Sequence, residues 1–510
     1  MPLCVGVRAG MLRSVIRGVI TDSHTPCRAR ALLVGAAALA SVFFLAPRAS
    51  AGIADPDPSF SGDGQTTVGF GSEASADAIA VAPDGDLVVV GAVGLVDNRD
   101  FAVARLNPNG TLDSGFSEDG RLTVDLGGDE RATGVAVRAD GRIAVAGTST
   151  DRFAVLQLQS DGSPDETFAA DGSVQFGFGD HDEGFAQDVV LDAAGNTIVV
   201  GYGSADGADD VDMAIARVAP TGELDDTFAS DGKLTAGLDR VESPSSDHAS
   251  AVTLLPSGEI AIAGDHFQAP NGNGLFGRVD GSGSIELLES LGSGRYYGAR
   301  DIAVLADGTP VTVGYYQPHG PPGGSAMAWS FDASGADEAW DFAGAPDVRA
   351  QANSIAPLAD GNAVVSGAIG RQGNLFLLDP SSETGFVAHA PIGFAASEVA
   401  LSDGKTVAAG SAAGQFAVAR FLAPTIDTPN TKIVAGPKGK VTKATVSFRF
   451  RARPGAASFE CKLDGRRWRS CDSPARLGGL DAGRHRFRVR AVSGDGERDP
   501  TPAKRRFKVA

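Results

Sequence analysis

The hydrophobic positions of this chain recur in a unit of two apolar runs that are separated by a polar turn and followed by a glycine. A clear example is AIAVAPDGDLVVVG, which starts at Ala78. Similar segments return about every 53 residues, and the seven copies start at Ala78, Gly134, Asp188, Ala251, Asp301, Ser354 and Glu398. Asp or Ser followed by Gly is typical of a tight hairpin turn, so each copy predicts two paired β-strands.

Two further apolar runs follow the hairpin in the stronger copies, for example FAVARL from Phe101 and RLTVDL from Arg121. The run LVVVG has no polar alternation, which predicts a strand buried on both faces. Four short strands in a repeat of this length are typical of a ring of small antiparallel sheets. We therefore predict an all-β fold with a seven-bladed β-propeller over residues 52–424.

A loop motif separates the third and fourth runs, with Asp, then Phe three residues later, then Asp-Gly three residues after that. Its Phe residues are Phe60, Phe116, Phe168 and Phe228. The first copy precedes QTTVGF, a fourth strand with no first three, whereas the last unit ends near Leu422 without a fourth strand. We predict that the N-terminal strand completes the last blade, because this closes the ring and removes exposed sheet edges.

The units DPSFSGDGQTTV, AVAPDGDLVVVG and FAVARLNPNGTLDSGFSEDG resemble the delta-60 repeat, a bacterial tandem repeat assigned to β-propellers and without a defined function. The resemblance covers residues 55–424, strongly in the first three units and weakly in the middle. It implies a propeller fold and no catalytic residues.

The first 51 residues differ from the rest of the chain. A basic segment precedes the apolar run Ala31–Ala46, and Ala49-Ser50-Ala51 follows. This order is typical of a secretory signal peptide, and the apolar run is short for a membrane span. We predict a signal peptide over residues 1–51 and a secreted protein, extracellular or at the cell surface, with no transmembrane span after cleavage. A retained N-terminal anchor is the alternative.

Residues 425–510 contain short alternating strands that predict a β-sandwich. They resemble bacterial Ig-like modules of the fibronectin type III-like class, on the hairpin FECKLDGRRWRSC from Phe459. Cys461 and Cys471 are the only cysteines after the predicted signal peptide, and in an exported chain they predict a disulfide.

The charge is distributed unevenly along the chain. Residues 425–510 carry 21 Lys and Arg against 8 Asp and Glu, whereas the repeats are acidic. The strand RHRFRVRA places its arginines on one face: Arg484, Arg486, Arg488 and Arg490. That face is either simply solvated or a site for an anionic ligand. We expect the module to act as a spacer or as a cell-surface docking domain.

One column of the repeat is polar but variable: Asp77, Thr133, Gln187, Ser250, Arg300, Asn353 and Ser397. The next position adds acids at Asp188, Asp301 and Glu398. Since first strands line the channel of a propeller, these residues are expected at one mouth of it, where ligands commonly bind. The candidate rim site is Asp77, Gln187, Asp188, Arg300, Asp301, Asn353 and Glu398.

Catalytic motifs are missing from the sequence. The seven histidines show no metal-ligand spacing, and there is no GxSxG motif. We predict no catalytic, cofactor-binding or metal-binding residues. The alternative is calcium, because residues 180–183 and 206–212 concentrate carboxylates, although such loops are more often simply solvated.

The predicted function is therefore a non-catalytic binding or structural scaffold, monomeric, with an extracellular ligand such as a cell-envelope polymer or a protein, and no nucleic acid. The alternative is an extracellular propeller hydrolase or lyase for carbohydrates or lactones, with Asp77, Asp188, Asp301 or Glu398 as acid and base. An enzyme requires two such carboxyls in one deep pocket with shifted pKa values, whereas a scaffold predicts exposed, separate carboxylates.

Overall fold

The computed structural model describes most of the chain after the predicted signal peptide. The ranges are 53–179, 181–204, 211–237, 245–268, 271–289, 296–317, 324–332, 335–343, 348–380, 385–423, 430–437, 439–442, 445–453, 458–492, 498–499 and 502–510. Every regular element in these ranges is a β-strand, and none of the described residues forms a helix able to cross a membrane. The predicted signal peptide lies outside the described residues.

Three separate sheets each contain four consecutive antiparallel strands. The first comprises β2 (Ala74–Val81), β3 (Leu87–Leu95), β4 (Asn98–Leu106) and β5 (Arg121–Val124). The second comprises β6 (Glu130–Val137), β7 (Ile143–Ser149), β8 (Arg152–Leu158) and β9 (Ser173–Phe176). The third comprises β22 (Ala350–Pro357), β23 (Ala363–Ile369), β24 (Gln372–Leu378) and β25 (Phe386–Pro391).

The strands between the second and third sheets follow the same four-strand order. They are β10 (Gly184–Leu191), β11 (Thr197–Ser204), β12 (Val211–Val218) and β13 (Lys233–Ala236); then β14 (Ser246–Leu254), β15 (Ile260–Gln268), β16 (Asn271–Val279) and β17 (Ile285–Glu289); then β18 (Tyr296–Val304), β19 (Pro310–Gln317), β20 (Ser325–Asp332) and β21 (Gly335–Ala343). Single parallel pairings, Val211 with Ser246 and Gly272 with Tyr296, join these runs into one sheet.

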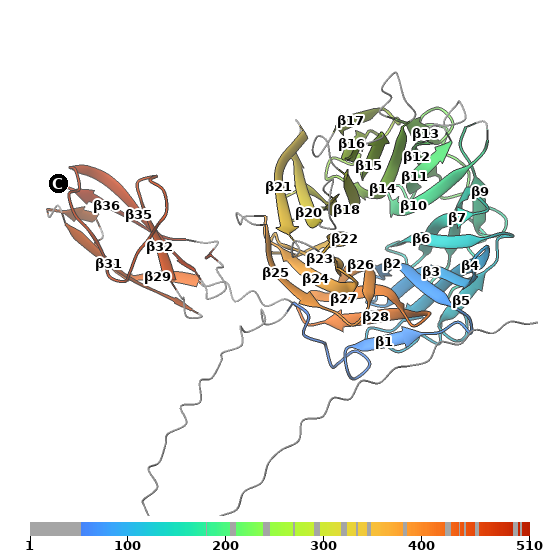
Figure 1. Cartoon of the computed structure of the whole chain (residues 1–510), viewed down its shortest axis with the longest axis horizontal. Helices are drawn as coiled ribbons and strands as arrows, with labels where there is room; N and C mark the ends of the chain where they lie inside the picture. Colours follow the sequence, from blue (N-terminus) through green and yellow to red (C-terminus); the bar gives the residue numbers. More distant parts are fainter. Residues whose placement is uncertain are drawn as a thin grey trace, which may run out of the picture. The chain divides into compact units, whose positions relative to one another are not determined.

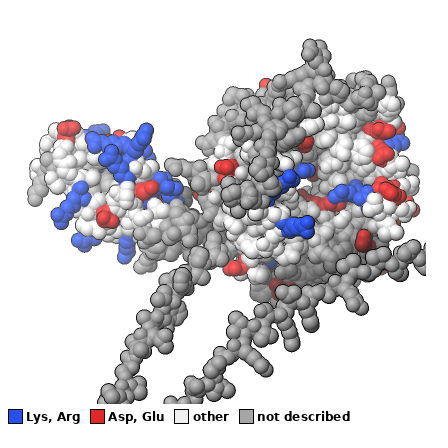
Figure 2. Space-filling model, in the orientation of Figure 1, with Lys and Arg blue, Asp and Glu red and all other residues white. Residues whose placement is uncertain are grey.

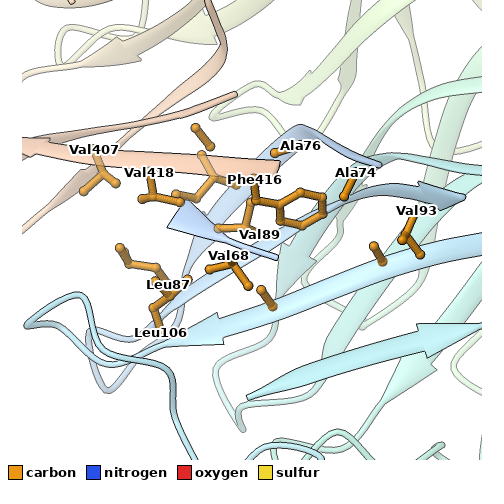
Figure 3. Close-up of a cluster of buried hydrophobic side chains, with 14 of the residues drawn as sticks. Val68, Ala74, Ala76, Leu87, Val89, Val93, Leu106, Val407, Phe416 and Val418 are labelled. Carbon is orange, nitrogen blue, oxygen red and sulfur yellow. The ribbon is translucent and has the colours of Figure 1, made fainter. Parts of the chain in front are cut away.

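The last sheet of the repeats combines both ends of this region. It contains β26 (Ala395–Ser402), β27 (Lys405–Ala412), β28 (Gln415–Phe421) and the N-terminal β1 (Gln65–Val68). β1 runs antiparallel to β28, with Val68 opposite Phe416. Val68 and Phe416 also pack with Val89 and Leu106 of the first sheet (Figure 3). The pairing predicted for the N-terminal strand is confirmed.

The sheets form a closed ring. Their first strands, β2, β6, β10, β14, β18, β22 and β26, contact one another in this order, and β26 contacts β2. Figure 1 shows the ring with these strands around its centre. The described repeats therefore have the architecture of a β-propeller.

The second strand of each sheet is packed on both faces, as β3 illustrates. Leu87 and Val89 pack with Val418 of the preceding sheet, whereas Val88 and Val90 pack toward β6–β8 of the following one. This is why the run LVVVG carries no polar alternation.

The loop motif joins neighbouring sheets. Phe116 is fully buried in the cluster that contains Ile143 of the second sheet. The Ser117 N–H donates to Asp161 O at 2.8 Å. A side chain at Gly162 would collide with the Phe116 ring. The repeated Phe is therefore an anchor between sheets rather than within one.

The C-terminal module contains two sheets. One is β29 (Asn430–Ala435), β31 (Val446–Arg453) and β34 (Ala475–Leu477). The other is β30 (Gly439–Val441), β36 (Ala503–Val509), β35 (Gly483–Val492), β32 (Ser458–Leu463) and β33 (Arg469–Ser470). Phe448 and Phe487, one from each sheet, stack in a shared core at 4.1 Å between ring centroids. A disulfide joins Cys461 to Cys471.

Candidate functional site

Each first strand of the ring contains a β-bulge at the variable polar column. The pairing of each first strand with its second strand skips one residue. The skipped residues are Asp77, Thr133, Gln187, Ser250, Arg300, Asn353 and Ser397. A bulge leaves its residue outside the ladder and redirects the side chain. The column is therefore polar because these side chains do not enter the core.

The bulge residues gather around one hollow. A cavity of about 1070 Å³ is lined by Asp77, Thr133, Gln187, Arg300, Asn353 and Ser397, whereas Ser250 is not among its lining residues. These residues come from the first strands of six different repeats, so the cavity exists only because the ring is closed. We call it the mouth cavity.

Three bulge side chains also link neighbouring sheets. Thr133 Oγ1 donates to Ala186 O at 3.0 Å. Asn353 Nδ2 donates to Ala396 O at 2.9 Å, and Ser397 Oγ donates to Ala76 O at 3.1 Å. Each acceptor lies in the next sheet around the ring. These residues therefore have a structural role in addition to lining the cavity.

Ion pairs set the electrostatics of the mouth cavity. Arg131 Nη2 lies 2.5 Å from Asp77 Oδ1, and Arg99 Nη2 lies 2.5 Å from Asp129 Oδ2. The guanidinium of Arg300 lies over the Tyr315 ring, 5.2 Å from its centroid. Asp77 and Asp129 are thus each paired with an arginine, whereas Arg300 packs against an aromatic ring.

Sequence reasoning missed the aromatic part of the cavity. Phe185 and Tyr202 line it and stack with ring centroids 5.1 Å apart, and His248 lies 4.2 Å from the Tyr202 ring. Phe185 stands two residues before the bulge residue Gln187, in the same place as Arg131 relative to Thr133. The period-two alternation of the first strand could have identified this second column.

The three acids of the next column do not line the mouth cavity. They connect first strands instead: Asp188 Oδ2 accepts from Val252 N at 2.8 Å, and Asp301 Oδ2 accepts from Ile355 N at 2.7 Å. Glu398 Oε2 accepts from Ile79 N at 2.6 Å, across the junction of the last and first sheets. Each carboxyl therefore holds the backbone of a neighbouring first strand.

The same acids are enclosed and have raised pKa values. Burial, and then the charge of Asp301, raise the pKa of Asp188 to about 7. Burial raises the pKa of Asp301. Burial together with the charges of Asp301 and Asp188 raises the pKa of Glu398 well above its ordinary value. Exposed carboxylates were expected of a scaffold; here they are enclosed because the residue after the bulge points between neighbouring first strands.

Asp188 and Asp301 have little capacity left for a substrate. The second oxygen of Asp188 accepts from Val189 N at 2.7 Å, and that of Asp301 accepts from Ile302 N at 2.6 Å. With both oxygens held by backbone N–H groups, these carboxyls suit a structural link better than proton transfer.

Of the two segments in which the sequence suggested calcium, Asp180 and residues 206–210 lie outside the described residues. In the described part, Asp182 accepts hydrogen bonds from Arg152 Nη2 at 2.5 Å and from Gly177 N at 3.0 Å. A different acidic group is described. It consists of Asp100, Asp125 and Glu130, which each place one carboxylate oxygen within 4.8 Å of the other two.

Comparisons with known proteins agree with the propeller fold and give no activity. Residues 82–116 and 138–168 match a family described as "Domain of unknown function (DUF5122) beta-propeller". No curated protein matches the chain.

Similar solved structures include the extracellular domain of one component system BT4673 from B. thetaiotaomicron, with 10% identity, a TM-score of 0.41 and coverage of 87% of this chain and 57% of that one. Puromycin hydrolase has 16% identity and a TM-score of 0.43, and the match covers 75% of this chain and 60% of the hydrolase chain. The WD40 propeller domain of Doa1 has 13% identity and a TM-score of 0.41, and the match covers 69% of this chain and 94% of that domain. The chain thus spans just over half the length of the first of these domains. The family match supports a β-propeller of a repeat type without an assigned function.

Proposed function

We propose that this protein is a secreted, non-catalytic binding scaffold. Residues 1–51 would be the signal peptide, residues 52–424 a seven-bladed propeller that binds an extracellular ligand, and residues 425–510 an Ig-like β-sandwich that docks it. The observation that carries the proposal is the mouth cavity, since six different first strands each contribute a polar side chain to it. Propellers commonly bind ligands at such a mouth.

The lining of the mouth cavity favours a polar, uncharged ligand such as a saccharide. The charges of Asp77 and Asp129 are already neutralised by arginines. The amides of Gln187 and Asn353 line the same cavity as the stacked rings of Phe185 and Tyr202. Amides can bond hydroxyl groups, while an aromatic face packs against the C–H surface of a sugar ring.

The enzyme alternative rests on the raised pKa values of Asp188, Asp301 and Glu398. Shifted pKa values are common at catalytic sites. However, structural burial shifts them as well, and these carboxyls bond backbone N–H groups away from the mouth cavity. The geometry therefore favours the binding scaffold.

A basic face on the C-terminal module supports its docking role. Like charges stand directly opposite one another on β35 and β36, in three rows: Arg484 with Lys508, Arg486 with Arg506, and Arg488 with Lys504. Figure 2 shows Lys and Arg side chains gathered on this module. A hollow of about 760 Å³ is lined by members of all three rows. We call these six residues the basic face.

The basic face lowers the stability of the C-terminal module when no ligand is bound. Like charges that oppose each other across strands destabilise a sheet. The nearby Glu460 is occupied by Arg490 at 2.7 Å, and no carboxylate in the described residues pairs with the six side chains. A polyanion would remove this repulsion, so the arrangement supports a binding surface better than an ordinary solvated face.

An anionic polymer of the cell envelope fits the basic face better than a nucleic acid. Single-stranded nucleic acids are usually held by aromatic rings that stack on the bases. The module's Trp468 is already covered by Arg490 and Lys462, whose charged groups lie 4.5 and 5.7 Å from the ring centroid.

Binding to a glycan array and to isolated cell envelope, with and without residues 425–510, tests both parts of the proposal. Tyr202→Ala should weaken array binding about tenfold, while Phe267→Ala, an aromatic outside the mouth cavity, should not. Arg486→Gln with Arg506→Gln should weaken envelope binding. Lys432→Gln with Arg451→Gln removes the same charge from an opposed pair on the other sheet and should not. Full envelope binding without residues 425–510 would rule out the docking role.

A further inference from the structure

The carboxylates of Asp100, Asp125 and Glu130 meet at the seam between two neighbouring sheets. Asp100 lies on β4 and Asp125 directly follows β5, both in the first sheet, whereas Glu130 begins β6 of the second. One oxygen from each lies within 4.8 Å of the others. Two oxygens bound to one calcium ion at about 2.4 Å each can be up to about 5 Å apart. The three groups are therefore spaced for a single cation.

Glu130 differs from the other two acids because it is buried and one of its oxygens has no hydrogen-bond partner among the described residues. Its side chain is fully buried. Oε1 accepts a hydrogen bond from Ser149 Oγ at 2.9 Å, but Oε2 is buried with no hydrogen-bond partner in the described part of the chain. A buried carboxylate oxygen without a partner is strongly unfavourable unless a cation satisfies it.

The protein supplies no cation for these carboxylates among its described residues. The two arginines adjacent to the group in sequence pair with other acids: Arg99 donates to both oxygens of Asp129, and Arg131 pairs with Asp77. Burial and the negative charge of Asp125 raise the pKa of Asp100. The group therefore has the charge, as well as the spacing, that a bound cation would balance.

We propose that Asp100, Asp125 and Glu130 bind a calcium ion that fastens the first sheet to the second. The donors are all carboxylate oxygens, without His or Cys, which selects hard cations over zinc or copper. Calcium is favoured over magnesium because the carboxylates come from three separate elements, and calcium accepts irregular coordination whereas magnesium requires a near-ideal octahedron. None of the three residues lines the mouth cavity, and the site does not depend on the proposed ligand.

Calorimetric titration of the purified, chelator-treated protein with calcium chloride tests the proposal. One ion per chain is expected to bind, and the thermal unfolding midpoint should rise because calcium binds only the folded state. Glu130→Gln and Asp100→Asn should each weaken calcium binding about tenfold or more. Without calcium, both variants should unfold no earlier than the unmodified protein, because they remove like-charge repulsion.

Asp97→Asn is the matched control. Asp97 is exposed in the turn between β3 and β4, and its φ of 73° is a conformation that Asn also tolerates. The Asp97→Asn substitution removes one negative charge, as Asp100→Asn does, and should leave calcium binding unchanged. Absence of calcium binding by the unmodified protein, an equal loss in the Asp97 variant, or tighter binding of magnesium chloride would each overturn the calcium site.

Discussion

Asp57 illustrates how a single side chain secures the closure of the ring. Burial alone would raise the pKa of Asp57. Hydrogen bonds from Lys405 and Ser59 and the charge of Arg420 nevertheless hold this pKa well below its usual range. Lys405 Nζ and Arg420 Nε lie 2.7 and 2.8 Å from its Oδ2. Arg420 Nη1 also donates to Pro108 O in the first sheet. The N-terminal loop is thereby tied to both sides of the junction.

Asp57→Asn should lower the free energy of unfolding by about 3 kcal/mol, because it leaves a buried arginine without its counter-charge. A lowered pKa contributes stability above the unfolded value near 4 and loses it below. The difference between the variant and the unmodified protein should therefore shrink from pH 6 to pH 3 in urea denaturation. A difference that does not change with pH would contradict this origin.

Asp188 should produce the opposite pH dependence. Its pKa in the folded protein is about 7, so between about pH 4 and pH 7 the folded state binds the extra proton and stability falls as pH rises. We expect this to amount to about 1 to 3 kcal/mol. Asp188→Asn should flatten that part of the curve. An unchanged curve would show that Asp188 is not the titrating group.

At the scale of elements, adhesion between sheets comes from the loop motif as well as from the strands. Phe60, Phe116, Phe168 and Phe228 are all fully buried. Arginines on the third strands support the loops: Arg105 lies 3.3 Å from Asp113, and Arg217 lies 2.7 Å from Asp225. Both also donate to a carbonyl of the next repeat, at Ser160 and Gly281.

Phe116→Ala should cost about 3 to 4 kcal/mol, because it empties a fully buried site between two sheets. Leu95→Ala is a suitable control, since Leu95 is 70% exposed and should change stability by less than about 0.5 kcal/mol. Thermal or urea unfolding monitored by circular dichroism measures both. Equal effects would mean that the motif does not anchor neighbouring sheets.

Removal of residues 52–68 should leave β28 as an open edge, with Phe416 no longer covered by Val68. Open apolar edges pair with other chains. We expect dimers or larger species in size-exclusion chromatography with light scattering, whereas removal of residues 1–51 alone should not produce them. A stable monomer would show that β1 is dispensable for closure.

At the scale of the whole molecule, acidic repeats and a basic C-terminal module share one chain. The charge on the module is concentrated in opposed rows, so its contribution to binding should be electrostatic and screened by salt. Envelope binding should therefore weaken strongly between 50 and 500 mM NaCl, while saccharide binding at the mouth cavity should change little. Salt-insensitive envelope binding, measured by co-sedimentation, would count against the basic face.

Much of the ring could be predicted from the sequence because its signals are local. Turn residues such as those at Asp84-Gly85 mark the hairpins, and the unbroken run Leu87–Val90 marks a strand between two sheets. The missing fourth strand after Leu422 and the spare one at Gln65 predicted their pairing. The candidate site was predicted only as a column of positions, since one repeat cannot reveal which side chains of other repeats it meets.

By itself, therefore, the sequence determined the order of strands, the periodicity and the closing partner of the N-terminal strand, because hydrophobic spacing and turn chemistry act within a few residues. Only the tertiary structure decided that the bulge residues line one cavity while Asp188, Asp301 and Glu398 bond neighbouring strands. It also brought Glu130 to Asp100 and Asp125 at a seam. These arrangements depend on the register at each bulge and on side chains from different sheets, which meet only when the ring is closed.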